Sequence, residues 1–399
     1  YFQGKIIPAI TMNNDIKIGI PLHLQKGEIL SLLLKSDTTI RDVSIHWHGF
    51  EMKGKQAYDG VVGLTQCAIR PNRPYLYNFT VDEIPGTYWY HTHSGLASGQ
   101  WHEFIKGPLI VHEDKVPSDA YITPFSYNNE RIIFLQDMLK LEPNVGMQNA
   151  VGGLSGVITR GRTGDIVGTH PWLGGIINGA ENESEGTIIN VEPEVEYRFR
   201  IINGGDVFAF NFSIPGIKLH VISTDGADLP CKKPIEVDSI FIWTAERYDI
   251  LVTFPKSLND QTILYTARTL EPAENGYNHY VNGLIRIGSN APYTLSKFIP
   301  VPKNPIILNC YVGQLASGTC IPFATLSLFD NPYCKQSTSS TTSLLSTKKS
   351  STTSATSSFN LLTKSLSQSF SSSFFETQSE KLLLQKQSQS KSEFQSESE

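Results

Sequence analysis

The sequence is a succession of short apolar runs, each closed within a few residues by Gly, Pro or Asn. β-Branched and aromatic residues dominate these runs, which favours strands. Neither of the two blocks that contain these runs shows the 3.6-residue apolar period of an amphipathic helix. The runs are Val43 to Ile45, Tyr75 to Phe79, Thr87 to Tyr90, Tyr197 to Ile202, Phe208 to Ile214, Leu219 to Ser223, Ile235 to Trp243 and Asp249 to Phe254. We therefore expect an all-β fold of sandwiches or barrels.

The runs fall into two blocks, and a change of composition follows them. A Gly- and Thr-rich segment, residues 145–171, interrupts the second block and is expected to be a long surface loop. After Cys334, Ser, Thr, Gln and Lys dominate, which leaves too little apolar surface to offset chain entropy. The sequence thus predicts one domain over residues 1–116, a second over 117–325, and a disordered low-complexity tail over 326–399.

Charge and hydropathy exclude two classes of partner. Charged residues make up 18% of the 399 residues, the net charge is −5, and the basic residues are scattered. Nucleic-acid binding normally requires a basic patch, so we expect no nucleic-acid partner. No run approaches the roughly 20 consecutive apolar residues of a membrane helix, so no membrane span is expected.

Three triplets have the form of N-glycosylation acceptors, and they begin at Asn78, Asn182 and Asn211. The five cysteines include no C-x-x-C pair, which argues against a zinc ribbon or a thioredoxin-like redox site. The chain begins without an apolar leader. We expect a secreted or extracellular glycoprotein whose signal peptide is not part of this sequence.

Two His-x-His pairs, His46/His48 and His91/His93, are the strongest candidates for chemistry. Side chains alternate along a strand, so both histidines of a pair project to one face about 6.5–7 Å apart. That separation is too long for one small ion in a flat strand and suits neighbouring ions of a cluster. Imidazole binds copper, zinc and iron, so ligand type alone does not name the metal.

The alternative is that each pair consists of ordinary surface or hydrogen-bonding histidines. For a single isolated pair that interpretation would be favoured. The two pairs, however, hold four of the ten histidines, and both lie in aromatic runs with glycine close behind. We therefore favour a metal cluster.

The motifs around and beyond these pairs are Ser44 to Phe50, Tyr58 to Val61, Thr65 to Ile69, Gly86 to Gly95, Trp172 to Gly179, Tyr197 to Asn203 and Glu246 to Val252. In order and spacing they resemble the first two cupredoxin domains of laccases and related multicopper oxidases. The likeness covers roughly residues 1–325. It implies two cupredoxin-like Greek-key β-sandwich domains and copper as the cofactor.

The resemblance also implies roles for individual residues. The position of His46 is that of a type 2 copper ligand, and His48, His91 and His93 match ligands of the type 3 coppers. These four are half of the ligands of such a cluster. Asp59 stands where the family keeps a carboxylate that assists proton delivery, although on local grounds it is an ordinary turn aspartate.

A second acidic residue of the family has no direct match. The usual Asp-Gly after the second pair is absent, and Glu103 is the nearest candidate for that place. His102, beside it, is expected to be a loop histidine rather than a fifth ligand.

The third cupredoxin domain of the family carries "H-P-x-H-x-H" and "H-C-H" motifs, and neither occurs here, where the last histidine is His279. We therefore expect a missing third domain as a partner, and an exposed histidine face. Cys310 and Cys320 resemble the link into that domain. They are predicted either to form a disulfide or to be unpaired thiols.

Three functions are consistent with these features. The first is a laccase-type oxidation of a phenol or similar donor coupled to reduction of O2 to water, incomplete in this chain. The second is a ferroxidase with a metal-ion donor, because Leu76 to Val81 resembles fungal iron oxidases equally well. Glu181, Glu183 and Glu185 would then either bind iron or form a solvated loop. The third is a non-catalytic, secreted copper-binding protein.

Overall fold

A computed structural model describes the protein at residues 9–10, 12–13, 18–37, 43–93, 102–139, 172–181, 184–206, 208–229, 234–269, 279–309 and 319–321. The chain divides into two compact units, Tyr1–Ser337 and Thr338–Glu399. All described residues belong to the first unit. The predicted loop over 145–171 and the predicted tail over 326–399 lie outside the described residues.

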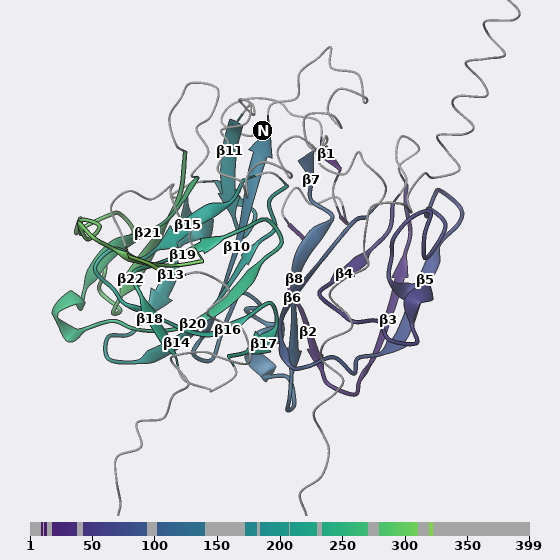
Figure 1. The fold of residues 1–399 in the computed structure, drawn as a ribbon, viewed down its shortest axis with the longest axis horizontal. Coiled ribbons are helices and arrows are strands. Elements are labelled where there is room, and N and C mark those ends of the chain that lie inside the picture. Colours follow the sequence, from purple (N-terminus) through teal and green to yellow (C-terminus); the bar gives the residue numbers. More distant parts are fainter. Residues whose placement is uncertain are drawn as a thin grey trace, which may run out of the picture. The chain divides into compact units, whose positions relative to one another are not determined.

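The described part is all-β, as the sequence predicted (Figure 1). Its helical segments are short 3-10 helices: η1 (Gln56–Tyr58), η3 (Ser118–Tyr121), η4 (Glu185–Thr187) and η5 (Lys256–Leu258). Within these residues no helix has the length and hydropathy needed to cross a membrane.

The first sandwich is formed by the purple and blue strands of Figure 1. Its four-stranded sheet has the order β2-β8-β6-β4, and a two-stranded sheet pairs β3 with β5. A further pair joins β1 to β7 in parallel. The bounds are β1 (Ala9–Ile10), β2 (Leu22–Gln25), β3 (Ile29–Leu34), β4 (His46–His48), β5 (Tyr75–Thr80), β6 (Gly86–His91), β7 (His102–Glu103) and β8 (Lys106–His112).

Alternation along these strands builds the core of the first sandwich. In β5, Tyr77 and Phe79 are buried while Leu76 and Asn78 are exposed. Trp47 of β4 is fully buried and packs edge-on against the rings of Tyr77 and Phe79. The core therefore lies between the β3–β5 ribbon and the four-stranded sheet.

The second sandwich contains the teal to green strands. One sheet runs β12-β11-β10-β14-β20-β16-β17, with β18 pairing β16 and β9 pairing β10; the other runs β13-β22-β21-β15-β19-β23-β24. The bounds are β9 (Ser126–Tyr127), β10 (Glu130–Leu139), β11 (Trp172–Ile177), β12 (Ala180–Glu181), β13 (Ile189–Val191), β14 (Glu196–Asn203), β15 (Phe210–Ser213), β16 (Leu219–Thr224), β17 (Ala227–Asp228), β18 (Ile235–Val237), β19 (Ser239–Ile242), β20 (Arg247–Thr253), β21 (Gln261–Thr269), β22 (Tyr280–Ile287), β23 (Ile306–Leu308) and β24 (Thr319–Ile321).

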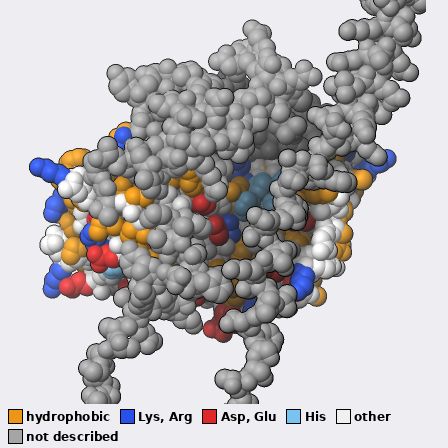
Figure 2. Space-filling model, viewed as in Figure 1, with side chains coloured by type: hydrophobic (Ala, Val, Ile, Leu, Met, Phe, Trp, Pro, Cys, Tyr) orange, Lys and Arg blue, Asp and Glu red, His pale blue; other side chains and the backbone are white. Residues whose placement is uncertain are grey.

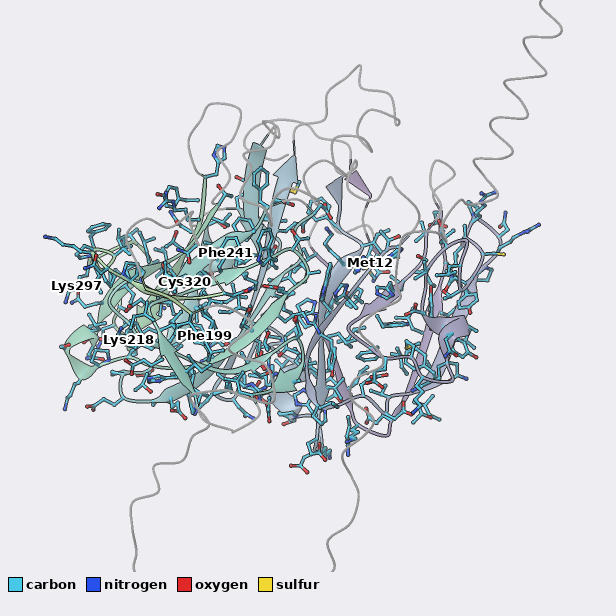
Figure 3. All side chains as sticks on the ribbon, in the orientation of Figure 1. Met12, Phe199, Lys218, Phe241, Lys297 and Cys320 are labelled. Atoms are coloured by element: carbon cyan, nitrogen blue, oxygen red, sulfur yellow. The ribbon has the colours of Figure 1, made fainter. Side chains whose placement is uncertain are left out.

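Large apolar side chains from both sheets fill the second sandwich. Phe199 of β14 is fully buried in this core, and Phe241 of β19 is buried as well, whereas Lys297 is exposed at the periphery (Figure 3). Cys320 of β24 is disulfide-bonded. Cys310 lies outside the described residues, so the pairing of Cys310 with Cys320 stays a prediction.

Two predicted strands differ from the observed ones. The run Ile235 to Trp243 is not one strand: it breaks at Asp238 into β18 and β19, which belong to different sheets. Asp238 makes this corner because its backbone N–H donates to the carbonyl of Ile306 and its carboxylate accepts from the Ile306 N–H. Near the first histidine pair, the strand begins at His46, and Val43 forms only an isolated bridge.

Strand β6 of the first sandwich docks on β14 and β20 of the second through buried polar groups. The Thr87 hydroxyl donates to Asp249 at 2.7 Å and accepts from Arg200 at 2.7 Å. Asp249 is also paired with Arg198 and Arg200, and the Arg247 Nε donates to the Thr87 carbonyl at 3.1 Å. Asp249 and Arg200 are almost fully buried, so each charge is neutralised inside the protein rather than by water.

Candidate metal centre

Strands β4 and β6 position the histidines. In their antiparallel register His46 lies opposite His91 and His48 lies opposite Trp89. Opposite residues of such a pair point to the same face of the sheet, and Trp47 points to the other face, into the core. One face of this strand pair therefore carries His46, His48, Trp89 and His91 together.

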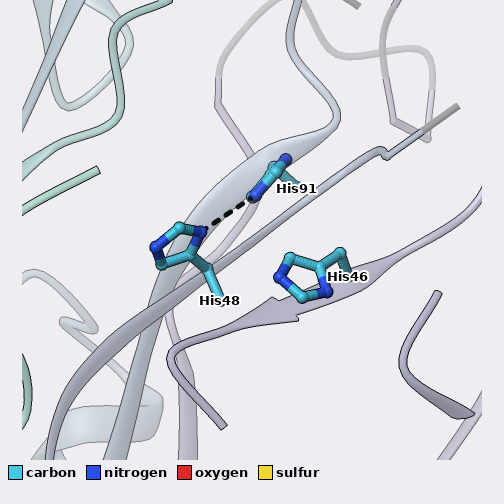
Figure 4. Close-up of side chains that lie close together, drawn as sticks. All are labelled: His46, His48 and His91. Carbon is cyan, nitrogen blue, oxygen red and sulfur yellow. Dashed lines mark hydrogen bonds between the residues drawn. The ribbon is translucent and has the colours of Figure 1, made fainter. Parts of the chain in front are cut away.

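The histidine rings converge as the two pairs predicted. The ring centroid of His46 lies 5.7 Å from that of His48, 5.3 Å from that of His91 and 5.2 Å from that of His93. One ligand nitrogen from each of His46, His48 and His91 lies within 4.8 Å of the other two. Figure 4 shows these three rings turned toward one space, with His48 Nδ1 and His91 Nε2 3.3 Å apart. On the face seen in Figure 2, histidine side chains gather in one place.

Backbone acceptors fix the proton on two of the rings. His46 Nδ1 lies 2.8 Å from the Asp59 carbonyl oxygen, and His91 Nδ1 lies 2.8 Å from the Thr92 carbonyl oxygen. A carbonyl can only accept, so each Nδ1 carries the proton and donates it. The Nε2 atoms of His46 and His91 consequently carry the lone pairs that can bind a metal. In the metal-free structure the Nε2 lone pair of His91 accepts a hydrogen bond from His48 Nδ1 at 3.3 Å.

The surroundings keep the three imidazoles neutral. Burial lowers the pKa of His46, although Asp59 opposes this, and burial lowers the pKa of His91 well below 6.5. Burial, followed by the positive charge of Arg247, lowers the pKa of His48 to about 3. Neutral imidazole is the form that binds metal ions, so at neutral pH protons do not compete for these ligands.

A tight turn brings Asp59 to His46. Asp59 caps η1, and its carboxylate Oδ1 lies 3.2 Å from His46 Nδ1. Gly60 follows with φ +85°, and a Cβ there would come within 1.8 Å of the Ile45 carbonyl oxygen. Only glycine lets the turn pack this closely against the start of β4, so Asp59 lies beside His46.

His93 follows the end of β6 and lies at the rim. Its backbone N–H donates to the Ser44 hydroxyl at 3.1 Å, and its carbonyl accepts from Val62 at 3.1 Å. His93 is exposed, whereas His46, His48 and His91 are partly buried. The expectation of an exposed histidine face thus holds for His93 and is wrong for the other three. Trp89 stacks on His91 and lies against the His48 ring.

Glu103, the second predicted acid, cannot be assigned in the same way. Its backbone pairs with Ile10, and His102 pairs with Ala9, so these two residues form strand β7 rather than a loop. Their side chains lie outside the described residues. A catalytic role for Glu103 therefore stays a prediction.

Three residues of the centre were not predicted. Trp89 stacks on His91 with centroids 4.2 Å apart and lies 4.9 Å from the His48 ring. Arg247 reaches the centre from the second sandwich. It packs against Gly49, which follows β4, at a place where a Cβ on Gly49 would collide with the guanidinium group. Lys106, opposite His91 in β8, is buried and donates to the Gly204 carbonyl. The alternation of β6 could have indicated Trp89, since it puts residues 89 and 91 on one face.

The residues fit a copper centre. The donors are imidazole nitrogens without a thiolate among the described ligands, they are neutral, and they are oriented by backbone and carboxylate acceptors. Nitrogen donors of this kind bind cupric ions most tightly among the divalent first-row metals. Three ligand atoms within 4.8 Å of one another are close enough to hold a metal ion between them.

Comparison with known proteins agrees with this donor set. Family models described as multicopper oxidase match residues 2–116 and residues 145–283. The chain belongs to the multicopper oxidase family.

Similar curated proteins include laccases and an iron oxidase. A laccase of Pleurotus ostreatus is 34% identical over 255 residues, which are 61% of this chain and 42% of that protein. An iron transport multicopper oxidase of Kluyveromyces lactis is 29% identical over 245 residues, 61% of this chain and 35% of that protein. This multicopper oxidase chain spans about two fifths of the length of the curated relatives it matches.

Solved structures share the fold. A laccase from B. aclada, as its L499M mutant, matches 75% of this chain and 53% of its own, with a TM-score of 0.52 and 25% identity. Fet3p, a multicopper oxidase that functions in iron import, matches 73% of this chain and 49% of its own, with a TM-score of 0.54 and 24% identity. The predicted cupredoxin-type β-sandwiches are thereby confirmed.

Proposed function

We propose that this chain supplies half of a trinuclear copper centre in a laccase-type oxidase that oxidises phenols or similar donors and reduces O2 to water. The observation that carries the proposal is the group of His46, His48 and His91, with ligand nitrogens within 4.8 Å of one another. His93, at the rim, is proposed as the fourth ligand. Residues 1–116 and 117–325 are proposed as the two cupredoxin domains.

The side chains around the ligands have separate tasks in this proposal. His46 would hold the type 2 copper, and His48, His91 and His93 would hold type 3 coppers; bound copper supplies one-electron redox chemistry. Asp59 orients His46 through its carbonyl and carboxylate, and its Oδ1 can take up or release a proton 3.2 Å from Nδ1. Glu103 is proposed as a second proton-exchanging acid. Trp89 excludes water from the inner side of the ligands.

A third cupredoxin domain, as a separate partner or further chain, is proposed to complete the centre. The described ligands leave the cluster open on one side, at the exposed His93. A cysteine thiolate with two histidines, the ligand set of blue copper sites, is not formed by the described residues. The chain alone is therefore expected to bind one or two cupric ions weakly, without intense blue absorption or turnover.

A copper titration of the chain tests this proposal. We expect binding of one or two cupric ions by calorimetry, weakened at least tenfold in His46→Ala and His91→Ala. His220→Ala, at a partly exposed histidine of β16, is the matched control and should bind as the parent does. Unchanged copper binding in both ligand variants would refute the site. A strong blue band, or copper-dependent O2 uptake with a phenol, would refute the incompleteness of the centre.

Ferroxidase activity is the second candidate, because a similar protein is an iron transport multicopper oxidase. The oxygen-uptake assay distinguishes the two when a third domain is supplied, by comparing ferrous iron with a phenol as donor. Of the acidic residues proposed for iron, Glu181 is exposed in β12, while the side chains of Glu183 and Glu185 lie outside the described residues.

We further propose that the protein is secreted. The disulfide of Cys320 supports this, because disulfides persist mainly in oxidising compartments. Fractionation of the producing cells would test it, and a purely cytosolic protein would contradict it.

A further inference from the structure

The outer face of the β3–β5 ribbon exposes an apolar surface. Inward side chains of both strands, such as Leu30 and Phe79, pack in the core. The alternate side chains point outward, and among them Ile29, Leu33 and Leu76 remain 67%, 54% and 48% exposed. Three such residues on one short ribbon, which forms its own two-stranded sheet, are an apolar patch that calls for a covering group.

Asn78 lies at the centre of this patch. In the register of the ribbon Asn78 is opposite Ser31, Leu76 is opposite Leu33, and Thr80 is opposite Ile29. Direct and diagonal neighbours in an antiparallel pair lie within about 8 Å. The three exposed apolar side chains therefore surround the Asn78 amide on both strands.

Asn78 also begins an Asn-Phe-Thr acceptor triplet in a geometry that suits modification. Asn78 and Thr80 are both exposed on the outer face, and Phe79 between them is 5% exposed. The amide can thus carry a bulky group without displacing any core residue.

The Asn211 triplet has the opposite environment. Strand β15 is an inner strand, paired with β19 on one side and β21 on the other. The Asn211 Oδ1 is buried, and Ser213 is 7% exposed. A glycan on Asn211 would have no path to solvent that leaves the sheet intact, so the two triplets are not equivalent. Asn182 lies outside the described residues.

We propose that Asn78 carries an N-linked glycan that lies over Ile29, Leu33 and Leu76, and that Asn211 is unmodified. The proposal rests on the secretion proposed above. In the transfer, Asn78 Nδ2 forms a bond to the anomeric carbon of a lipid-linked oligosaccharide. The bond from that carbon to the diphosphate oxygen breaks, the lipid diphosphate leaves, and the amide nitrogen loses one proton. Nothing is oxidised or reduced. The glycan makes the apolar ribbon compatible with water.

Peptide mass spectrometry tests the site. The full chain is produced behind an added secretory leader in a eukaryotic host and analysed before and after release of N-glycans. We expect glycan on the peptide containing Asn78 and none on the peptide containing Asn211. Asn78→Gln and Thr80→Val should abolish it, Thr80→Ser should retain it, and Asn211→Gln should leave it unchanged. A bare Asn78 in the secreted chain, or a glycan on Asn211, would overturn the proposal.

Self-association tests the covering role. Asn78→Gln should shift the chain from monomer to larger species in light scattering, and adding Leu33→Thr and Leu76→Thr should restore the monomer. An Asn78→Gln variant as monodisperse as its parent would overturn the covering role. Because neither readout involves copper, these results are independent of the copper titration that tests the proposed oxidase.

Discussion

His23 and His112 form a partly buried pair beside the segment that leads from β8 to β9. His23 Nε2 lies 2.9 Å from the Pro124 carbonyl oxygen and must donate to it. His23 Nδ1 therefore accepts, at 3.1 Å, from His112 Nε2. Both rings are neutral in this arrangement, and protonating His23 at Nδ1 would break the bond between them.

The pair makes stability depend on pH. Burial, and then the positive charge of Arg200, lowers the pKa of His112 from 6.5 to about 4. Arg198, and His23 when it is protonated, act in the same direction, and Glu130 opposes them. The unfolded chain therefore binds more protons between pH 6.5 and 4, so the free energy of unfolding falls as the pH falls through this range. The lowered pKa of His112 can reduce the free energy of unfolding by at most about 3.4 kcal/mol at low pH. Solvent screening at the half-buried His112 brings the expected loss to about 1–2 kcal/mol.

The perturbation is His112→Gln, whose amide can donate to His23 Nδ1 but does not titrate. Urea unfolding of metal-free protein would be measured from pH 7.5 to 4.5. We expect parent and variant to differ little at pH 7.5, and the variant to lose about 1–2 kcal/mol less on acidification. The histidines other than His23, the direct partner of His112, contribute equally to both proteins. His220→Gln gives the baseline for losing a partly exposed histidine. Parallel stability curves for the parent and His112→Gln would refute this reasoning.

Two further substitutions test the interface and the metal-centre turn. Asp249→Asn removes the buried carboxylate shared by the buried Arg200 and the partly buried Arg198, and leaves Glu130 as the only carboxylate that the described structure pairs with Arg200. It should lower the free energy of unfolding by about 3–5 kcal/mol in urea titrations. Asp225→Asn, at a 41% exposed partner of Arg247, should change it by less than about 1 kcal/mol, and equal effects would contradict the role of burial. Gly60→Ala forces a Cβ onto the Ile45 carbonyl and should lower the melting temperature and copper affinity. Gly63→Ala, with φ +84° and nothing near its Cβ, should show only the backbone strain of about 1 kcal/mol; equal losses would count against the clash.

The histidine cluster was predictable because strand alternation is a local rule. It places His46 and His48 on one face whatever the rest of the fold does. The pairing of His46 with His91 could not be predicted in this way. The register between distant strands is set by tertiary packing rather than by the sequence of either strand alone. The resemblance to a family supplied what local rules could not: which two strands meet.

Charged residues account for most of what the sequence did not predict. Arg200 and Asp249 lie in strands whose alternation would place them on a solvated face. In the protein the first sandwich covers that face through Thr87 of β6, and both residues are buried. Asp238 is a similar case: it lies in the middle of an apolar run, and only the contact with Ile306 shows that it turns the chain from one sheet to the other.

Strand β6 carries Thr87, Trp89 and His91 on one face, so the surface that binds the second sandwich continues without a break into the ligand surface. A ligand at one end and a docked domain at the other thus share a single rigid element. Thermodynamic linkage makes any such coupling mutual: if metal favours one docking of the sandwiches, that docking favours the metal by the same factor. A substitution that weakens the contacts of Thr87 with the second sandwich would then lower the metal affinity of the histidines, although Thr87 is not a ligand.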